Sequence, residues 1–544
     1  MIQLTYPDGR KKEFAKTGDF TRITVATPEQ AGILTVSCHI PLVDVHAVWV
    51  TSLVPGPEKR NLPWVLEQYS GIQKNFPFAA TFNISGRNRG CFATTDLVDD
   101  TCIRLEINQE LGTYDITCTI ALSEQSSAFD ILLDCRDLDW QQVLEEWRNT
   151  VVPEKKQYPA AAQDPVYCTW YAVHGAVTEA FVERTCPVAK ELGFTTLIVD
   201  DGWSYPEKKR VSPQTISNWY ETIGDWEVST EKFPDFKAHV KRMQDLGMKY
   251  MLWVAPHLWG LKSALYHTHP GETMGTPLEG YDKMDVNKAD FLPLIQKLRD
   301  LAHDNRLDGL KIDFLDIVVP DVHRPNARMT GKLISGLTGA LKDADPDVLI
   351  EFRQSYATPG MLPYATQFRA GDVPFNWLTN FGRLAELRLS LGNLGIIHAD
   401  PAYWPQGELC ENVARHMMAM LLGVPMISMD LERLSCGEKR IIRYYIDLYN
   451  QLRDLIHYGS WHIYFGVSDV EAAVAENDTQ RLIVLNDPGR LFRCSAGGNK
   501  KTFVLNLTDE ALPVSCTSAV DAFCQPVPGD CIPAAGSGIL ASGC

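Results

Sequence analysis

The sequence lacks the features that mark membrane and secreted proteins. It contains no run of about 18 apolar residues, the length that a membrane-spanning helix needs. Its opening, MIQLTYPDGRKKEF, has no basic segment followed by an apolar stretch, so we expect no signal peptide. The sequence therefore predicts a cytoplasmic protein with no membrane partner.

Motifs for metals and nucleotides are also missing. We find no H-E-x-x-H string, no calcium-loop pattern and no spacing of two histidines and a carboxylate that would hold iron or zinc. Neither G-x-G-x-x-G nor G-x-x-x-x-G-K-[ST] occurs, which argues against a nucleotide cofactor. We therefore expect no metal and no cofactor.

The fourteen cysteines form no C-x-x-C pair and no cluster with histidine at zinc spacing. Scattered cysteines of this kind favour buried thiols in a reducing compartment. Disulfides near the end of the chain, where Cys516, Cys524, Cys531 and Cys544 lie close together, remain the alternative.

Positive charge is in short supply. Asp and Glu together number 68 and Lys and Arg 51, which gives a formal net charge of −17. Such a balance disfavours nucleic acid and anionic membranes as partners, because their phosphates would be repelled. A neutral or cationic ligand fits better.

The first part of the chain reads as β structure. With 544 residues and 45% apolar composition, the chain is too long for one core, so two or three domains are expected. Short β-rich runs such as RITVAT, GILTVSCHI and YDITCTIAL alternate with turn signals over the first 136 or so residues, which predicts an antiparallel sandwich. A helix near 140–148 and a Pro-rich, charged linker at 151–165 follow, so we expect an N-terminal domain over 1–160.

From residue 166 the pattern changes to apolar strands separated by longer helical segments, which is typical of βαβ units. Eight strands over about 265 residues predict an α/β fold, a (β/α)8 barrel, as the catalytic domain over 161–459. β-like runs return after an amphipathic helix at 438–456, so a small β domain is expected over 460–544. The expected barrel strands are 166–172, 194–200, 249–255, 308–313, 347–352, 365–370, 395–400 and 424–430.

Several of these strands end in carboxylates. An ionised Asp at the end of a buried strand must be solvated or paired, and the carboxyl ends of barrel strands surround one shared pocket. Two carboxylates facing each other across a pocket lined with tryptophan suit glycoside cleavage, which needs an anion beneath the anomeric carbon and a proton donor at the leaving oxygen. We choose Asp313 and Asp372, from the fourth and sixth strands. The other residues expected at the pocket are Trp170, Asp200, Asp201, Trp253, Lys311, Glu351, Arg353, Arg369, His398 and Asp400.

The neighbours of the two acids indicate different roles. Lys311 precedes Asp313 by two positions and so shares its strand face, where an ammonium favours the ionised form that a nucleophile requires. Asp372 lies in FRAGDVPFNW, where partial desolvation by aromatic side chains favours the protonated form of an acid catalyst. Arg369 would act in the opposite direction, unless it binds a sugar hydroxyl instead.

Structural roles compete with these functional ones. An Asp at a strand end is commonly a helix cap or a turn residue, and we assign Asp316, Asp400 and Asp430 to that class. Trp170 and Trp253 could fill the barrel core or its lid rather than stack on a sugar. One residue of the adjacent pair Asp200 and Asp201 could be structural, since neighbours on a strand point to opposite faces.

The strings LIVDDGW, GDWEVSTEKFPDF, YMLWVAP, LDGLKIDF and FRAGD, in this order, resemble the α-galactosidase clan, most closely glycoside hydrolase family 36. The resemblance spans about 165–405. It implies that Asp200 and Asp201 bind the 4- and 6-hydroxyls of galactose, that Trp226 lines the sugar site and that Lys311 reaches the 3- and 4-hydroxyls.

The same resemblance implies that Asp313 is the nucleophile and Asp372 the acid/base of a retaining mechanism. The chain departs from the family after the fifth strand, where IEFRQSY replaces a Cys-Ser-Gly-Gly-Gly string near the 2-hydroxyl, so that Glu351 and Arg353 add charge and bulk. RAGD replaces W-x-S-D and is nearer to raffinose-synthase-like relatives, and HADPAYW has no counterpart.

We therefore predict a retaining, exo-acting glycoside hydrolase for terminal α-galactoside-like sugars in an oligosaccharide or glycoside substrate. An α-N-acetylgalactosaminidase, a β-L-arabinopyranosidase, a raffinose-synthase-like transglycosylase and a non-catalytic sugar-binding relative remain alternatives. Members of the family commonly form oligomers, which the β domains could support.

Overall fold

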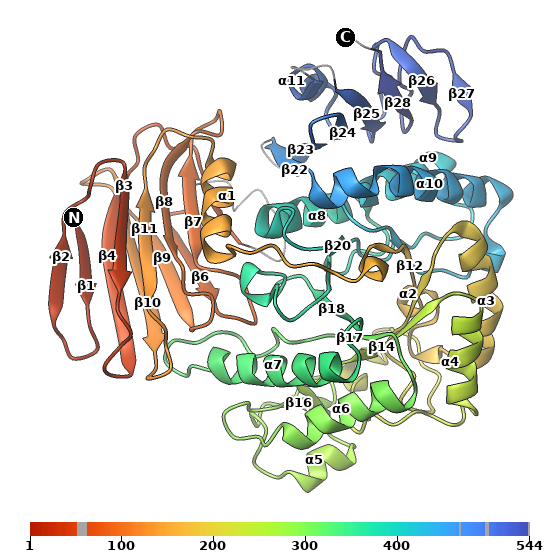
Figure 1. The fold of residues 1–544 in the computed structure, drawn as a ribbon, viewed down its shortest axis with the longest axis horizontal. Coiled ribbons are helices and arrows are strands. Elements are labelled where there is room, and N and C mark those ends of the chain that lie inside the picture. Colours follow the sequence, from red (N-terminus) through yellow and green to blue (C-terminus); the bar gives the residue numbers. More distant parts are fainter. Residues whose placement is uncertain (52–61, 467–468, 496–499, 542–544) are drawn as a thin grey trace.

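The computed structural model describes residues 1–51, 62–466, 469–495 and 500–541. Two antiparallel sheets form the N-terminal part, a ring of parallel strands surrounded by helices forms the middle, and one further sheet forms the C-terminal part (Figure 1). The expected fold class, a barrel flanked by β structure on both sides, is confirmed.

The N-terminal sheets face each other as a sandwich. Strand β3 alternates exposed and buried residues from Phe20 to Val25, which is the pattern of a strand with one face on a core, whereas β5, β7 and β11 are buried at every residue. The strands occur in the orders β2-β1-β4-β10-β9-β6 and β3-β11-β8-β7-β5. They are β1 (Ile2–Thr5), β2 (Lys11–Phe14), β3 (Phe20–Val25), β4 (Gly32–Pro41), β5 (Ala47–Val50), β6 (Val65–Ser70), β7 (Phe78–Phe82), β8 (Asn88–Thr94), β9 (Thr101–Asn108), β10 (Thr113–Leu122) and β11 (Phe129–Asp134).

The barrel strands are parallel throughout and occur in the order β20-β19-β18-β17-β14-β13-β12-β21. A single parallel bridge between His398 and Val424 links β20 to the segment that leads into β21 and closes the ring. Each of the eight expected strands is found. They are β12 (Val166–Cys168), β13 (Thr196–Val199), β14 (Lys249–Val254), β17 (Gly309–Ile312), β18 (Leu349–Arg353), β19 (Gln367–Arg369), β20 (Ile397–His398) and β21 (Met426–Ile427).

Helix ends follow the local sequence. The Thr178 side chain caps α3 at its start, and Gly193, at φ +98°, ends it in a left-handed conformation that suits glycine. A capping box between Ser435 and Glu438 begins the longest helix, α10. The helices are α1 (Trp140–Val151), α2 (Trp170–Val173), α3 (Glu179–Leu192), α4 (Phe236–Asp245), α5 (Ala264–Thr268), α6 (Leu292–Asp304), α7 (Ala327–Ala344), α8 (Trp377–Leu391), α9 (Cys410–Ala419), α10 (Cys436–Tyr458) and α11 (Leu491–Ser495).

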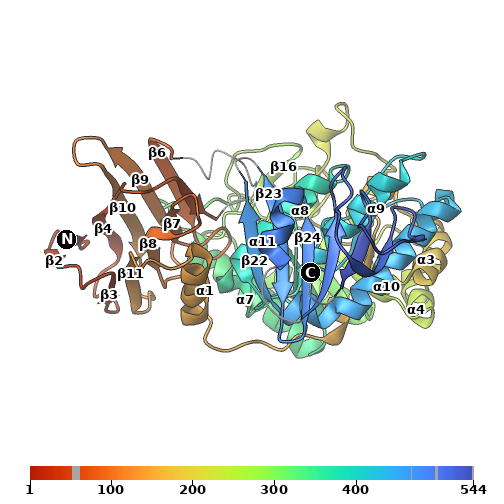
Figure 2. The same cartoon turned by 90° about the horizontal axis from the view of Figure 1, so that it is seen from above.

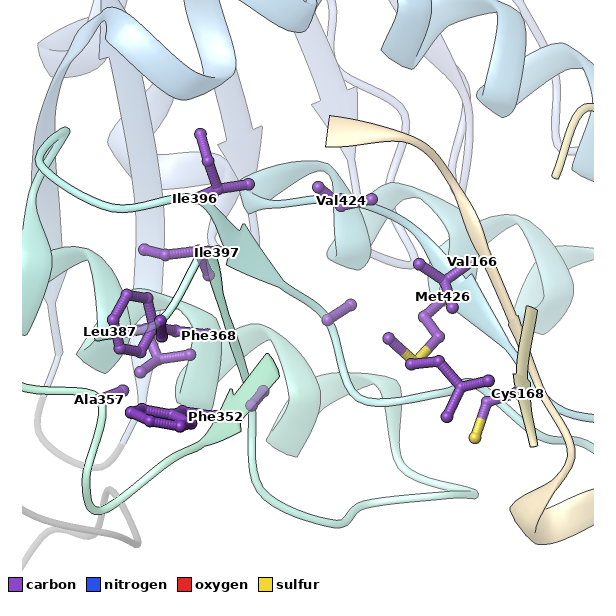
Figure 3. Close-up of a cluster of buried hydrophobic side chains, with 14 of the residues drawn as sticks. Val166, Cys168, Phe352, Ala357, Phe368, Leu387, Ile396, Ile397, Val424 and Met426 are labelled. Atoms are coloured by element: carbon purple, nitrogen blue, oxygen red, sulfur yellow. The ribbon is translucent and has the colours of Figure 1, made fainter. Parts of the chain in front are cut away.

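Apolar side chains join the strands to the helices around them. Phe352 of β18 and Phe368 of β19 contact each other edge to face and lie beside Leu387 of α8 (Figure 3). Inside the ring, however, polar groups meet: Gln367 donates to Glu351 at 3.4 Å and lies 3.7 Å from the sulfur of Met251. Since barrel interiors are mostly filled by branched apolar residues, this polar filling is unusual.

The C-terminal sheet covers α8, α9 and α10, while the N-terminal sandwich lies to one side of the barrel (Figures 1 and 2). Helix α1 lies between the sandwich and α8 (Figure 1). One buried apolar cluster runs through all three parts, from Trp49 through the barrel to Leu482. The C-terminal strands are β22 (Ser460–Phe465), β23 (Val470–Glu476), β24 (Gln480–Leu485), β25 (Lys501–Asn506), β26 (Cys516–Val520), β27 (Pro526–Val527) and β28 (Ser537–Leu540), and the two-stranded pair β15 (Leu258–Gly260) and β16 (Tyr281–Lys283) lies in a barrel loop.

Several expectations concern single positions. Cys524 and Cys531 are free thiols, whereas Cys544 lies outside the described residues. The string AGGNK at 496–500 predicts a turn, but residues 496–499 lie outside the described residues. Among the described residues, no helix has the length and apolarity needed to cross a membrane. Domain boundaries at 160 and 459 remain predictions.

Candidate active site

The expected site residues lie at the carboxyl ends of neighbouring barrel strands. Asp200 and Asp201 follow β13, Asp313 follows β17, Asp372 follows β19 and Asp400 follows β20. Parallel strands bring these ends to one rim. Contacts across the rim, such as that between Lys311 Nζ and Asp200 Oδ2 at 2.5 Å, show that the structure gathers them.

Asp313 is held by three donors and is 5% exposed. Trp253 Nε1 donates to Oδ2 at 3.0 Å, while the backbone N–H of Phe314 donates to Oδ1 at 2.8 Å. Arg353 Nε lies 3.1 Å from Oδ1. Although burial alone would raise the pKa of Asp313, the positive charges of Arg353 and Lys311 outweigh it and hold the pKa below its usual value. The carboxylate is therefore ionised, as the sequence predicts.

Asp200 and Asp201 are both buried, and they have different partners. Asp200 pairs with Lys311, whereas Asp201 Oδ2 accepts from Trp219 Nε1 at 2.6 Å. The other oxygen of Asp201 and the indole nitrogen of Trp226 are buried and have no hydrogen-bond partner among the described residues. Buried polar atoms normally have partners, and the expected contact of these two residues with sugar hydroxyls remains a prediction.

Asp372 differs from the other acids because its side chain is 48% exposed. Arg369 Nη1 lies 3.0 Å from its Oδ1, and Arg383 donates to its backbone carbonyl at 2.8 Å. Burial raises the pKa of Asp372, but the charges of Arg369, Arg353 and Lys311 have the larger effect and hold it well below its usual range. Of the two opposing effects that we expect at Asp372, the charge of Arg369 thus outweighs desolvation, because its guanidinium contacts the carboxylate.

Glu351 lies deeper than expected. It is fully buried, and its Oε2 lies 3.2 Å from His398 Nδ1. His398 Nε2 lies 2.7 Å from the carbonyl of Ala162, which can only accept, so that nitrogen carries a proton. Glu351 thus fills the barrel interior, and its expected contact with substrate remains a prediction. Arg353 instead touches the nucleophile candidate.

The tryptophans expected at the sugar site differ in how deeply they are buried. Trp226 and Trp253 are each 2% exposed, and their rings lie 6.0 Å apart, next to Asp313. Trp170 is half-buried and contacts the rings of Trp219 and His174 edge to face. Stacking of Trp170 or Trp253 on a sugar remains a prediction.

Sequence reasoning placed Asp400 at the pocket but gave it the structural role of a cap or turn residue. Asp400 Oδ1 pairs with Arg369 Nη1, the same atom that contacts Asp372, and its Oδ2 accepts from Tyr171 at 3.0 Å and from the N–H of Val373 at 2.6 Å. Burial and the neighbouring charge of Asp372 raise the pKa of Asp400 to about 7, although Arg369 opposes the shift. The unmatched HADPAYW string at a strand end was the available signal.

One group of side chains has the spacing of metal ligands within the described parts of the chain. Ligand atoms of Glu179, Glu183 and His239, on α3 and α4, lie within 4.8 Å of one another. Arg242 contacts Glu179 at 2.9 Å and Glu183 at 2.7 Å. Its guanidinium already supplies the positive charge, so this group is an ion-pair cluster on the barrel's outer helices.

Comparison with known proteins places this geometry among carbohydrate enzymes. The melibiase family model matches residues 141–296. "Alpha-galactosidase 1" of Pediococcus pentosaceus is 25% identical over 321 residues, which are 54% of this chain and 41% of that protein. "Alpha-galactosidase AgaA" of Geobacillus stearothermophilus is 22% identical over 320 residues, 54% of this chain and 42% of the relative. The matched region thus spans less than half of these relatives.

Solved structures agree in fold over a larger share of the chain. The crystal structure of the GH36 α-galactosidase AgaA superposes with a TM-score of 0.63 at 15% identity, covering 89% of this chain and 80% of that one. The α-galactosidase of Lactobacillus brevis has the same TM-score and identity and covers 100% and 85%. Residues 141–296 of this chain thus match the melibiase model, the chain is similar to α-galactosidases over about half of its length, and it shares the fold of glycoside hydrolase family 36 structures.

Proposed function

We propose that this protein is a retaining, exo-acting glycoside hydrolase that removes terminal α-galactoside-like sugars from oligosaccharides or glycosides. The observation that carries the proposal is the contrast between two acids at one rim: Asp313 is buried and its pKa is held below the usual value, whereas the side chain of Asp372 is 48% exposed. Asp313 is close enough for the charge of Asp372 to raise its pKa. Variants of AgaA with the same fold have been solved in complex with raffinose and with stachyose, which supports an oligosaccharide substrate.

In the first step, an oxygen of Asp313 attacks the anomeric carbon while Asp372 gives its proton to the leaving oxygen. A glycosyl ester on Asp313 results. In the second step, Asp372 takes a proton from water, whose oxygen attacks the same carbon and releases Asp313. Two displacements return the original anomeric configuration. Asp201 and Trp226, with their unpartnered atoms, would bind hydroxyls of the sugar.

The test is a screen of aryl α- and β-glycosides that covers galactose, N-acetylgalactosamine and L-arabinose, with the anomer of the first product read by NMR. Release of α-galactose from an α-galactoside supports the proposal. Initial formation of the β-anomer would contradict a retaining mechanism, and cleavage of another glycoside only would reassign the sugar. Sugar transfer that exceeds hydrolysis at high acceptor concentration would favour the raffinose-synthase-like alternative, and no turnover of any glycoside would favour a non-catalytic binding protein.

Asp372 must hold a proton to act as an acid, and Asp400 provides a way to do so. With Asp372 ionised, Asp400 takes up a proton near pH 7. If that proton passes to Asp372, Asp400 becomes the ionised partner of Arg369. In either state the buried guanidinium keeps one carboxylate, so its charge is never left unpaired. We therefore propose Asp400 as a positioning residue for the acid/base.

Asp400→Asn is expected to move the alkaline limb of the kcat/KM profile to lower pH by about one unit. Without Asp400, Arg369 pairs with Asp372 alone and lowers its pKa, so the acid loses its proton earlier as pH rises. The loss in kcat/KM should be larger for alkyl galactosides than for nitrophenyl galactosides. Tyr171→Phe, which removes a donor to Asp400 but no charge, is the control and should keep the wild-type limb. An equal loss on both substrates at every pH would mean that Asp400 is only structural.

Arg353→Met is expected to move the acidic limb of the kcat/KM profile to higher pH by about one unit. The variant removes the nearest positive charge from Asp313, so the pKa of this buried carboxyl rises and more base is needed to ionise it. Arg353→Lys keeps the charge and serves as the control, with a smaller shift. An unmoved limb in the Met variant would show that Arg353 does not set the ionisation of Asp313.

A cytoplasmic location and assembly into a homo-oligomer are part of the proposal and rest on the sequence and its resemblance alone.

A further inference from the structure

A cavity separate from the candidate active site lies between helix α1, the end of α8 and the C-terminal sheet. Its volume is about 440 Å³. Helix α1, the end of α8 and strands β22 to β24 surround it, and Figure 1 shows α8 beneath the C-terminal sheet with α1 to one side of it. The cavity touches none of the residues assigned to catalysis. Its charged lining residues are Asp139, Glu145, Arg148, Arg388, Glu476, Arg481 and Arg493, with His462 among the neutral ones.

Two arginines in this wall are buried without an acidic partner. Arg388 is 1% exposed and Arg148 8%. Arg388 donates to the carbonyls of Leu422 at 2.7 Å and Gly392 at 3.1 Å, and Arg148 donates to the carbonyl of Leu389. Within the described residues, neither guanidinium forms an ion pair, and Arg388 Nη2 has no hydrogen-bond partner at all.

Both guanidiniums converge on Gly392, the residue that ends α8. Arg388 donates to its carbonyl, and a Cβ at this position would lie 2.9 Å from Arg148 Nη2. The free carbonyls of a helix end attract cations, so one arginine here could serve as a cap. Two arginines lie here, however, and Nη2 of Arg388 has no partner among the described residues, so capping of α8 does not account for both.

Burial without a counter-charge is unfavourable for both groups. It lowers the pKa of Arg148 to about 10 and that of Arg388 to about 9, since few opposite charges offset the loss of water. The nearby acids are used elsewhere: Glu476 pairs with Arg481 at 2.8 Å, and Asp139 caps α1 through the N–H of Gln141. Buried charges in proteins are normally paired. The missing partner is an anion.

We propose that this cavity binds a phosphate group, free or carried by a small hydroxylated molecule, between Arg148 and Arg388. Two guanidiniums match the charge of a phosphate and can each donate two hydrogen bonds to its oxygens. The remaining wall offers Gln142 and Glu145 for hydroxyls and the ring of Trp461, which already lies against Arg388 with 4.7 Å between the guanidinium carbon and the ring centre. Because α1, α8 and the C-terminal sheet all contribute to the wall, the anion would link these three elements.

Isothermal titration of the full chain with inorganic phosphate, at ionic strength held constant with chloride, tests the site directly. We expect saturable binding with a Kd in the millimolar range or below, and a rise in the midpoint of thermal unfolding with phosphate but not with chloride. Glucose 6-phosphate and glucose are the further probes. Tighter binding of the ester than of phosphate indicates a carried phosphate, whereas equal binding indicates the free ion. Absence of binding by both phosphate compounds would overturn the proposal.

Paired surface variants on α1 give a test that does not disturb the core. Gln142 and Glu145 are both exposed and line the cavity. Gln142→Glu adds a negative charge and should weaken phosphate binding several-fold, while Glu145→Gln removes one and should strengthen it by a similar factor. Phosphate affinity that is unchanged in both variants would place the anion elsewhere and contradict the proposal.

Arg388→Met separates an anion site from a helix cap. If Arg388 holds the anion, the variant loses at least tenfold in phosphate affinity, and its unfolding midpoint in chloride stays near that of the wild type because an unpaired buried charge has been removed. If Arg388 only caps α8, stability falls equally in chloride and in phosphate, and the midpoint still rises with phosphate. Arg433→Met, at an exposed arginine outside the cavity, is the control. If Arg388→Met does not fold, the variants Gln142→Glu and Glu145→Gln provide the test of the anion site.

Discussion

Asp313→Asn is expected to lower kcat on the order of 10⁴-fold, to near background, because an amide cannot attack the anomeric carbon or leave as a carboxylate. The variant keeps the size of the side chain. Trp253 and Phe314 donate to different oxygens of Asp313, and the amide keeps an acceptor for one of them only. Because the side chain still fills its place, substrate affinity should change far less than kcat. Turnover of an activated aryl galactoside, followed with a purified and folded variant, measures the effect.

Asp316→Asn is a matched control for that variant. Asp316 also lies within reach of Arg353, at 3.5 Å, and accepts from Ser355. Its replacement removes a carboxylate from the same guanidinium but not from the reaction, so most activity should survive. A 2-fluorogalactosyl reagent with a good leaving group should label Asp313 in the wild type and leave Asp313→Asn unlabelled. Labelling of another residue, or a mild loss in Asp313→Asn, would displace Asp313 from the role of nucleophile.

Asp372→Ala is expected to divide substrates by their leaving groups. On alkyl galactosides the loss should be about 10³-fold, within the usual contribution of a general acid. On dinitrophenyl galactosides, whose phenolate leaves without a proton, glycosylation of the enzyme should be nearly spared. The second step still lacks its base, so a burst of phenolate followed by slow turnover is the expected time course. Stopped-flow absorbance measures it.

Asp430→Ala provides the comparison, because Asp430 also follows a barrel strand but pairs with Arg433. It should lower activity on both substrate types by the same small factor, if at all. An equal and large loss on both types in Asp372→Ala would argue that this residue holds the site together and transfers no proton. External azide should speed turnover of the dinitrophenyl substrate by Asp372→Ala, because a small anion needs no general base. Its failure to do so would count against the assignment.

The sequence predicts the barrel well because its strands are short apolar runs that are buried on both faces. All four residues of β13 and all four of β17 are buried, and the acids Asp200 and Asp313 come directly after these strands. The strands β20 and β21, at two residues each, are shorter than expected, since a run of apolar letters shows burial but not which residues complete the ladder.

Ion pairs between strands depend on register, which a single sequence does not reveal. Lys311 is paired with Glu351 in the ladder, so Asp313, two residues on, comes next to Arg353. In the strand register, Arg369 of β19 lies opposite Arg353 of β18 on one side and opposite His398 of β20 on the other. Once this register is known, the contact of Arg353 with Asp313 follows. Without it, Arg353 could only be assigned to the general vicinity of the sugar.

The charge of Asp372 does not follow from the sequence for a related reason. Aromatic letters around it indicate desolvation, yet three residues of chain are enough to return Arg369 Nη1 to its carboxylate. The direction of the pKa shift depends on whether desolvation or the charge of Arg369 has the larger effect. The distance between the two side chains decides this, and the sequence does not give that distance.

The ring is held unevenly around its circumference. The candidates for hydroxyl binding and the nucleophile follow β13 and β17, and each of these strands pairs with β14 over four residues. Asp372 and Asp400 follow β19 and β20, which are paired over two residues, and one bridge links β20 to the segment before β21. Under the proposed roles, recognition of the sugar and handling of the leaving group are therefore built on separate arcs of the wall. Substitutions after β19 and β20 could therefore change which leaving group is accepted, while the residues after β13 and β17 still bind the same monosaccharide.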